Sequence, residues 1–163
     1  MKKSLVHFRP AQAEDAEAIA AMLVPYAREG LVLPRSAAEV RGHIGDFLVA
    51  ERGRQVLGCV ALRDYGRGLH EVRSLVVAPE AAGHGIGTQL VDAAVELART
   101  RGASRVFALT LRAHLFRRLG FVEVDKTMFP QKVWLDCARC RKRDQCDEVA
   151  VLLDPIPTAT TAP

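Results

Sequence analysis

Apolar residues recur along the chain with two spacings, and each spacing predicts a different element. Between residues 13 and 28, and again between 88 and 101, apolar positions repeat every three or four residues, which is typical of one face of an amphipathic helix. Short apolar runs bounded by glycine, proline or charged turns are typical of strands. Such runs predict strands over 5–9, 47–51, 56–62, 70–77, 105–110, 121–124 and 149–153.

Two shorter helices complete the pattern. Ser36 is a plausible N-cap, with Glu39 three residues later as its capping-box partner, for a helix that reaches about residue 44. A second short helix is expected over 112–119, ended by Gly120. The resulting order of strands and helices predicts an α/β fold of the α+β type, with a mixed sheet and helices on both of its faces.

A glycine-rich turn joins the strand over 70–77 to the helix that is expected from about Thr88. Gly83, Gly85 and Gly87 leave backbone N–H groups uncovered, and a helix N-terminus favours negative charge, so the turn is suited to a pyrophosphate. The spacing and mid-chain position do not match a Rossmann fingerprint, and the Gly-Lys-Ser/Thr of a Walker loop is absent. A glycine turn that merely enters the helix is the remaining alternative.

Length and charge narrow the classes of function. The 163 residues suit one ordinary domain, expected over 1–154, with a disordered tail over 155–163. No apolar run approaches the length of a membrane span or a signal-peptide core, so we expect a cytoplasmic chain with reduced cysteines and no membrane partner. The net charge of +4 is modest, and charges over 136–148 are balanced, which favours a small anionic ligand over nucleic acid.

The motif V-x-P-x-x-x-G-x-G-I-G-x-x-L, followed about 30 residues later by LFRRLGF, resembles the GNAT superfamily of acetyl-CoA-dependent N-acetyltransferases. The resemblance covers about residues 6–153 and implies a mostly antiparallel, twisted sheet of six to seven strands. Ala82 stands where the family usually has arginine or glutamine, which weakens the motif without removing its backbone groups. The acetyl-CoA-binding residues that the resemblance implies are Leu75, Val76, Val77, Gly83, His84, Gly85, Ile86, Gly87 and Thr88.

Five segments taken in order are similar to the short N-acetylglutamate synthases: GLVLPRS, HEVRSLVVAP, AGHGIG, FALTLRAHLFRRLGF and FPQKVWLDCARCRKRDQCDE. This narrower resemblance implies transfer of an acetyl group to the α-amino group of L-glutamate, the first step of arginine biosynthesis. It implies a small amino-acid acceptor and is compatible with a homodimer. A GNAT enzyme for another amine, such as another amino acid, a polyamine or a protein N-terminus, remains an alternative.

The strand over 70–77 carries the candidate catalytic residue. Because alternate side chains of a strand share a face, Glu71, Arg73, Leu75 and Val77 are expected on one face, and His70, Val72, Ser74 and Val76 on the other. Glu71 is then a candidate general base for the acceptor's ammonium group, and Arg73 a candidate ligand of an acceptor carboxylate. A surface ion pair without a catalytic role is the alternative.

Two further cations, Lys132 and Arg35, are candidates for binding the acceptor's carboxylates. The family often has a tyrosine as general acid four residues before Gly120, where this chain has Phe116, which cannot donate a proton. Solvent, or His114, is left for that role.

Cys137, Cys140 and Cys146 lie close together in the sequence, within a segment (126–148) that we expect to be inserted between the last two strands. The C-x2-C spacing is half of a zinc or iron-sulfur site, but a closed site needs a fourth ligand. A metal-binding or redox-sensing module on an acetyltransferase scaffold is therefore the alternative from another functional class. The segment is otherwise expected to wall the acceptor pocket and to bring Lys132 to it.

Overall fold

The computed structural model describes residues 5–129 and 148–157, in which seven strands form one sheet of order β1-β2-β3-β4-β5-β7-β6. Neighbouring strands are antiparallel except β4 and β5, which are parallel. The predicted mixed, mostly antiparallel sheet is thus confirmed. The strands are β1 (Val6–Pro10), β2 (Phe47–Arg52), β3 (Gln55–Asp64), β4 (Leu69–Val77), β5 (Arg105–Thr110), β6 (Val122–Val124) and β7 (Val149–Leu153).

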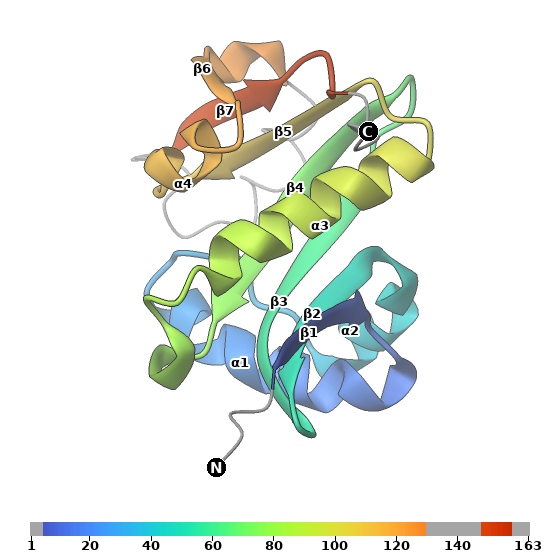
Figure 1. Ribbon diagram of the computed structural model, residues 1–163, viewed down its shortest axis with the longest axis vertical. Helices are drawn as coiled ribbons and strands as arrows, with labels where there is room; N and C mark the ends of the chain where they lie inside the picture. The colour runs from blue at the N-terminus through green and yellow to red at the C-terminus, as the bar shows by residue number, and fades with distance from the viewer. Residues whose placement is uncertain (1–4, 130–147, 158–163) are drawn as a thin grey trace.

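Helices cover both faces of the sheet, as expected (Figure 1). The helix α3 (Ile86–Thr100) lies across one face, and α1 (Ala16–Arg28) and α2 (Ala37–Gly42) pack on the other. The short α4 (Ala113–Arg117) contacts α3, β6 and β7. Single 3-10 turns occur at Ala13–Asp15, Ile44–Asp46, Pro79–Ala81 and Lys126–Met128.

Each face of the sheet has its own buried apolar cluster. On one face, residues of α3 such as Leu90 and Val91 pack with Val60 and Val72 of the sheet. On the other, Ile19 and Leu23 of α1 pack with sheet residues that include Cys59, Ala61 and Val76. The apolar stripes that predicted the two long helices are therefore the sides of these helices that pack on the sheet.

The capping box predicted at the start of α2 is confirmed. The Glu39 N–H donates to the Ser36 hydroxyl at 3.0 Å, and the Ser36 N–H donates to the Glu39 carboxylate at 2.8 Å. The helix itself ends at Gly42, slightly earlier than expected. By contrast, α3 begins at Ile86, two residues before the predicted start, so Ile86 and Gly87 lie in its first turn.

A β-bulge interrupts β4 and corrects the predicted alternation of its side chains. Arg73 pairs with Ala61 of β3, but Val76 pairs with Cys59, so β4 has one residue more than β3 over this stretch. Ser74 has a φ of 53°, in the left-handed region that L-residues rarely adopt, and the Cys59 thiol donates to its carbonyl at 3.5 Å. Beyond the bulge the faces are exchanged, so Val76, not Val77, shares a face with Glu71 and Arg73.

The parallel strands β4 and β5 are paired at one end only. Leu69, His70 and Glu71 pair with β5 at Arg105, Val106 and Phe107, and no pairing follows, although β4 continues to Val77. Figure 1 shows that β4 and β5 diverge toward the side on which α3 begins and α4 lies, and we call this divergence the fork. Among residues 5–129 and 148–157, no strand lies beside the edge of β4 on the β5 side from the bulge onward.

Candidate active site

The start of α3 has the features of an anion-binding helix N-terminus. Gly85 is the N-cap with a φ of 77°, it provides no side-chain cap, and the first turn contains no acidic residue. The first intrahelical bond runs from the Gln89 N–H to the Gly85 carbonyl at 3.1 Å, so Ile86, Gly87 and Thr88 have no acceptor within the helix. With fifteen residues, α3 is long enough for its dipole to favour a phosphate at this end.

The three glycines of the turn have different roles. A Cβ built at Gly83 would meet no atom within 4 Å, and at Gly85 only the Gln89 amide at 3.9 Å, and both residues have positive φ. These two glycines therefore leave open space at the start of the helix. A Cβ at Gly87 would instead lie 3.3 Å from Leu115 of α4 and 3.7 Å from Val77. Gly87 thus permits close packing between α3, α4 and β4, a role that the sequence did not reveal.

The predicted cofactor residues on β4 lie at its unpaired end. Val76 and Val77 are buried and Leu75 is half-buried. The Ala78 N–H donates to the Leu57 carbonyl of β3 at 2.7 Å. Because successive residues of a strand direct their backbone groups to opposite sides, the Val77 groups face the side that β5 has left. A ligand laid along this edge can therefore form strand-like hydrogen bonds.

Glu71 and Arg73 are brought together in a buried position. A guanidinium nitrogen (Nη1) of Arg73 lies 3.5 Å from the Glu71 carboxylate, and their side chains are 10% and 1% exposed, respectively. The pair is therefore buried and not at the surface, because both charges are withdrawn from bulk water. Glu71 is also the last residue of β4 that pairs with β5, so it lies where the two strands part.

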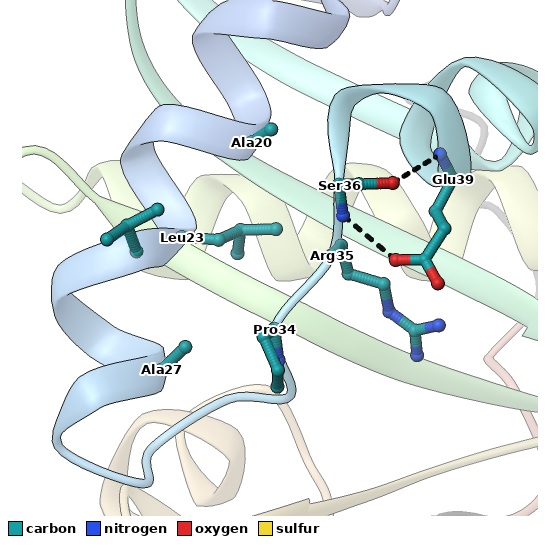
Figure 2. A pocket seen from close by; sticks show the side chains of 8 residues that line it. Ala20, Leu23, Ala27, Pro34, Arg35, Ser36 and Glu39 are labelled. Carbon is teal, nitrogen blue, oxygen red and sulfur yellow. Dashed lines mark hydrogen bonds between the residues drawn. The ribbon is translucent and has the colours of Figure 1, made fainter.

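Arg35 lies apart from this pair. It lines a pocket of about 330 Å³ between α1 and the segment that enters α2, and no lining residue comes from β4. Figure 2 shows Ala20, Leu23 and Ala27 on the α1 side, facing Pro34 and the capping box, while the Arg35 guanidinium points away from α1. Arg35 does lie on the sheet face that carries Glu71 and Arg73, because α1 and α2 pack there.

On α4, Phe116 is a packing residue. It is 2% exposed and meets Phe121 edge-on, with ring centroids 5.2 Å apart. His114 is exposed on the same short helix. Phe116 therefore fills the core.

His70 is a buried polar residue to which the sequence assigned no role. It is 2% exposed, and neither ring nitrogen forms a hydrogen bond with the described part of the chain. Its Nε2 lies 3.8 Å from an Asp64 carboxylate oxygen, too far for a hydrogen bond. Burial lowers the pKa of this imidazole below its usual 6.5, with Asp64 opposing that shift.

Lys132 and the three clustered cysteines, Cys137, Cys140 and Cys146, lie outside the described residues. Within 5–129 and 148–157, no group of three or more histidine, cysteine, aspartate or glutamate residues is arranged to hold a metal ion. Over the same ranges, none of the helices combines the length and hydropathy of a transmembrane segment.

Comparison with known proteins identifies the family of this chain. Residues 43–123 match the model of the acetyltransferase (GNAT) domain. An uncharacterized N-acetyltransferase of Chlorobaculum tepidum is 44% identical over 144 residues, which are 88% of this chain and 93% of that protein. An amino-acid acetyltransferase of Mycobacterium tuberculosis is 33% identical over 134 residues, 80% of this chain and 76% of the relative. Amino-acid acetyltransferases of Neisseria meningitidis are 32% identical, but the chain spans only 30% of their length.

Solved structures agree with the sequence relatives. The N-acetylglutamate synthase of Neisseria gonorrhoeae, complexed with coenzyme A and N-acetyl-glutamate, superposes with a TM-score of 0.82 at 26% identity, over 96% of this chain and 36% of that one. A Mycobacterium tuberculosis protein in complex with CoA gives 0.78 at 28% identity, over 91% and 98%. With its forked sheet, glycine turn and relatives along most of its length, the chain belongs to the GNAT family and is an acetyl-CoA-dependent N-acetyltransferase.

Proposed function

We propose that this enzyme acetylates the α-amino group of L-glutamate and so forms N-acetyl-L-glutamate, as in the first step of arginine biosynthesis. The buried Glu71–Arg73 pair is the observation that carries this proposal, because it offers a proton acceptor and a carboxylate-binding cation at the fork between β4 and β5. The amino-acid acetyltransferases among the relatives support the choice of acceptor.

The edge of β4 and the start of α3 are the parts that would hold acetyl-CoA. Gly83, Gly85 and the first-turn N–H groups of α3 would bind the pyrophosphate, and the backbone at 75–77 would bind the pantetheine arm. A backbone N–H of the same edge is a suitable donor to the thioester oxygen, where negative charge develops during attack. Acetyl-CoA supplies an acetyl thioester, whose C–S bond breaks as the new C–N bond forms.

Glu71 would act as the general base. Its carboxylate takes a proton from the acceptor's ammonium group, directly or through one water molecule, and frees the lone pair that attacks. Arg73 has a planar guanidinium that can bind a second carboxylate with two hydrogen bonds. Lys132 and Arg35 are proposed ligands of the acceptor's other carboxylate. Solvent would protonate the departing thiolate, since a thiol of ordinary pKa is a tolerable leaving group.

A comparison of acceptors tests the proposed substrate. Release of CoA thiol would be followed with glutamate, aspartate, glutamine and spermidine at matched concentrations. We expect the highest kcat/KM with glutamate, because Arg73, Lys132 and Arg35 are the proposed ligands of its two carboxylates. Failure of glutamate, or a clear preference for spermidine, would contradict the proposal, since a polyamine requires a site lined by carboxylates.

An arginine variant tests how the carboxylate is bound. Arg73→Leu is expected to raise the KM for glutamate about tenfold to hundredfold, the value of a lost charge-assisted hydrogen bond, and to change the KM for acetyl-CoA little. Arg41→Leu is the matched control, since Arg41 is an exposed arginine that pairs with Glu17 on the surface. If the two substitutions changed the KM for glutamate equally, Arg73 would not be part of the acceptor site.

A further inference from the structure

A hydrogen bond links α1 to the end of β4. Tyr26, in the last turn of α1, donates its phenolic hydroxyl to the Val77 carbonyl at an oxygen-to-oxygen distance of 2.5 Å. The ring is half-buried and packs against the apolar cluster beneath α1. The two residues are 51 positions apart in the chain, so the bond joins elements that have no local reason to meet.

The Val77 carbonyl needs such a partner because of the fork in the sheet. The neighbouring Ala78 N–H is directed to β3, so the Val77 carbonyl faces the opposite edge. In a regular sheet β5 would provide a donor there, but β5 pairs with β4 only as far as Glu71. A buried carbonyl without a donor is costly, and the Tyr26 hydroxyl satisfies it in place of the missing strand.

The same carbonyl lies next to the parts that receive acetyl-CoA. Val77 is the last residue of β4, directly before the turn that leads into α3. A methyl carbon of Val77 (Cγ2) would lie 3.7 Å from a Cβ built at Gly87, so the first turn of α3 rests on this residue. A displacement of Val77 would therefore move both the free edge of β4 and the start of α3.

We infer that Tyr26 is a positioning residue for acetyl-CoA. Its hydroxyl fixes the peptide at Val77, and the fixed peptide keeps the edge of β4 and the first turn of α3 in the arrangement that binds the pantetheine arm and the pyrophosphate. Tyr26 does not act on the reacting atoms, because its proton is directed to a main-chain carbonyl. The inference concerns the cofactor and holds whichever amine is the acceptor.

Tyr26→Phe tests the inference, since it removes one oxygen atom and keeps the packing of the ring. The expected results are a dissociation constant for CoA raised about two- to tenfold by calorimetry, a matching rise in the KM for acetyl-CoA and an unchanged KM for the acceptor. The matched control is Thr100→Val, which removes another hydroxyl that donates to a main-chain carbonyl, that of Leu97 at 2.8 Å, at the far end of α3. The control should leave CoA binding unchanged.

Two outcomes would overturn the inference. A lower Tm with unchanged CoA affinity would show that Tyr26 only stabilises the fold, and unchanged Tm and affinity would show that the bond has no energetic role. If the Tyr26→Phe variant does not fold, hydrogen exchange of the wild-type protein tests the role of Tyr26 instead. The Ala78 amide, which belongs to the peptide that Tyr26 holds and donates to the Leu57 carbonyl, should be protected before CoA is added. Rapid exchange of this amide that slows only with CoA would contradict a peptide fixed in advance by Tyr26.

Discussion

The two ends of β4 differ in how many neighbouring strands hold them. Over Leu69, His70 and Glu71, the strand is paired with β3 on one side and with β5 on the other. Beyond the bulge at Ser74, β3 is the one strand in the described part of the chain that pairs with it, and the Tyr26 hydroxyl donates to the Val77 carbonyl on the other side. The doubly paired end carries buried side chains that can transfer a proton, and the singly paired end offers backbone groups.

Under the proposed function, the two ends have separate tasks. A general base has to be held in one position, and a strand bonded on both sides provides that rigidity. A cofactor arm needs free N–H and carbonyl groups, which only an edge without a neighbour can offer. Because β4 and β5 diverge, β4 has a segment paired on both sides and a segment with an open edge within its nine residues.

The largest effect is expected when the proposed proton acceptor, Glu71, is removed from the doubly paired end of β4. Glu71→Gln keeps the size of the side chain, and we expect kcat to fall about 10²- to 10⁴-fold, the usual contribution of a general base, with CoA affinity unchanged. Steady-state kinetics and calorimetry measure both quantities. Glu123→Gln, which removes an exposed carboxylate paired with Arg117, is the control. A fall in kcat of only a few-fold would reject Glu71 as the base.

A second test separates backbone strain from cofactor binding at the open end. Gly85→Ala places a Cβ at a residue with a φ of 77°, and Gly53→Ala does so at 63° in the β2–β3 turn, where a Cβ meets no atom within 4 Å. Both should lower the free energy of unfolding by about 1–2 kcal/mol. Only Gly85→Ala should also weaken CoA binding, by about two- to thirtyfold, through the altered helix N-terminus. If the Gly85→Ala and Gly53→Ala variants bound CoA equally well, this turn would not be part of the cofactor site.

A third test concerns the boundary between the two ends. Ser74→Ile and Arg67→Ile each put a β-branched residue at positive φ, 53° and 55°, and each should lower the free energy of unfolding by about 1–2 kcal/mol. Chemical denaturation measures this. Only Ser74→Ile should also lower kcat/KM, because the bulge aligns Glu71 with the free edge. Full activity of a destabilised Ser74→Ile would show that the bulge is not needed for that alignment.

The smallest effect is expected from the buried imidazole of the doubly paired end. Burial holds the pKa of His70 below 6.5, so the unfolded chain binds a proton that the folded chain resists, and folding stability should fall as the pH drops below about 6.5. Asp64 and Asp46 oppose this shift, and Arg101 adds to it. His70→Asn should flatten the dependence of Tm on pH between 7.5 and 5. His43→Asn, at an exposed site, leaves the buried imidazole in place, so a flattened curve in that control would exclude His70 as the cause.

Much of the architecture could be predicted from the sequence because it depends on apolar spacing. The order of strands and helices along the chain, the two amphipathic helices and the Ser36–Glu39 capping box all follow from local patterns, and the structure confirms them. The glycine turn could be found because glycine is costly where nothing requires it. The proximity of Glu71 and Arg73 also follows from alternation, since both precede the bulge.

The features that were missed depend on contacts between distant segments. No local signal at Ser74 indicates an extra residue, because a bulge is defined by the register with β3. The packing role of Gly87 requires Leu115 to be in place, and the role of Tyr26 requires the fork. The roles of Lys132, Cys137, Cys140 and Cys146, the single domain over 1–154 and the disordered tail remain predictions.

The single extra residue at Ser74 also limits how this enzyme can be redesigned. The extra residue shifts the alternation of side chains along β4 by one position. A mutant library that varies every second residue would therefore sample one face of the sheet before the bulge and the opposite face after it. Removal of one residue there would restore regular pairing with β3 and would leave Glu71, Arg73 and Val76 on the face that they already share, because Arg73 and Val76 would still pair with Ala61 and Cys59. Grafting β4 beside a regular strand of another scaffold therefore requires either that the bulge is transferred with it or that the extra residue is removed.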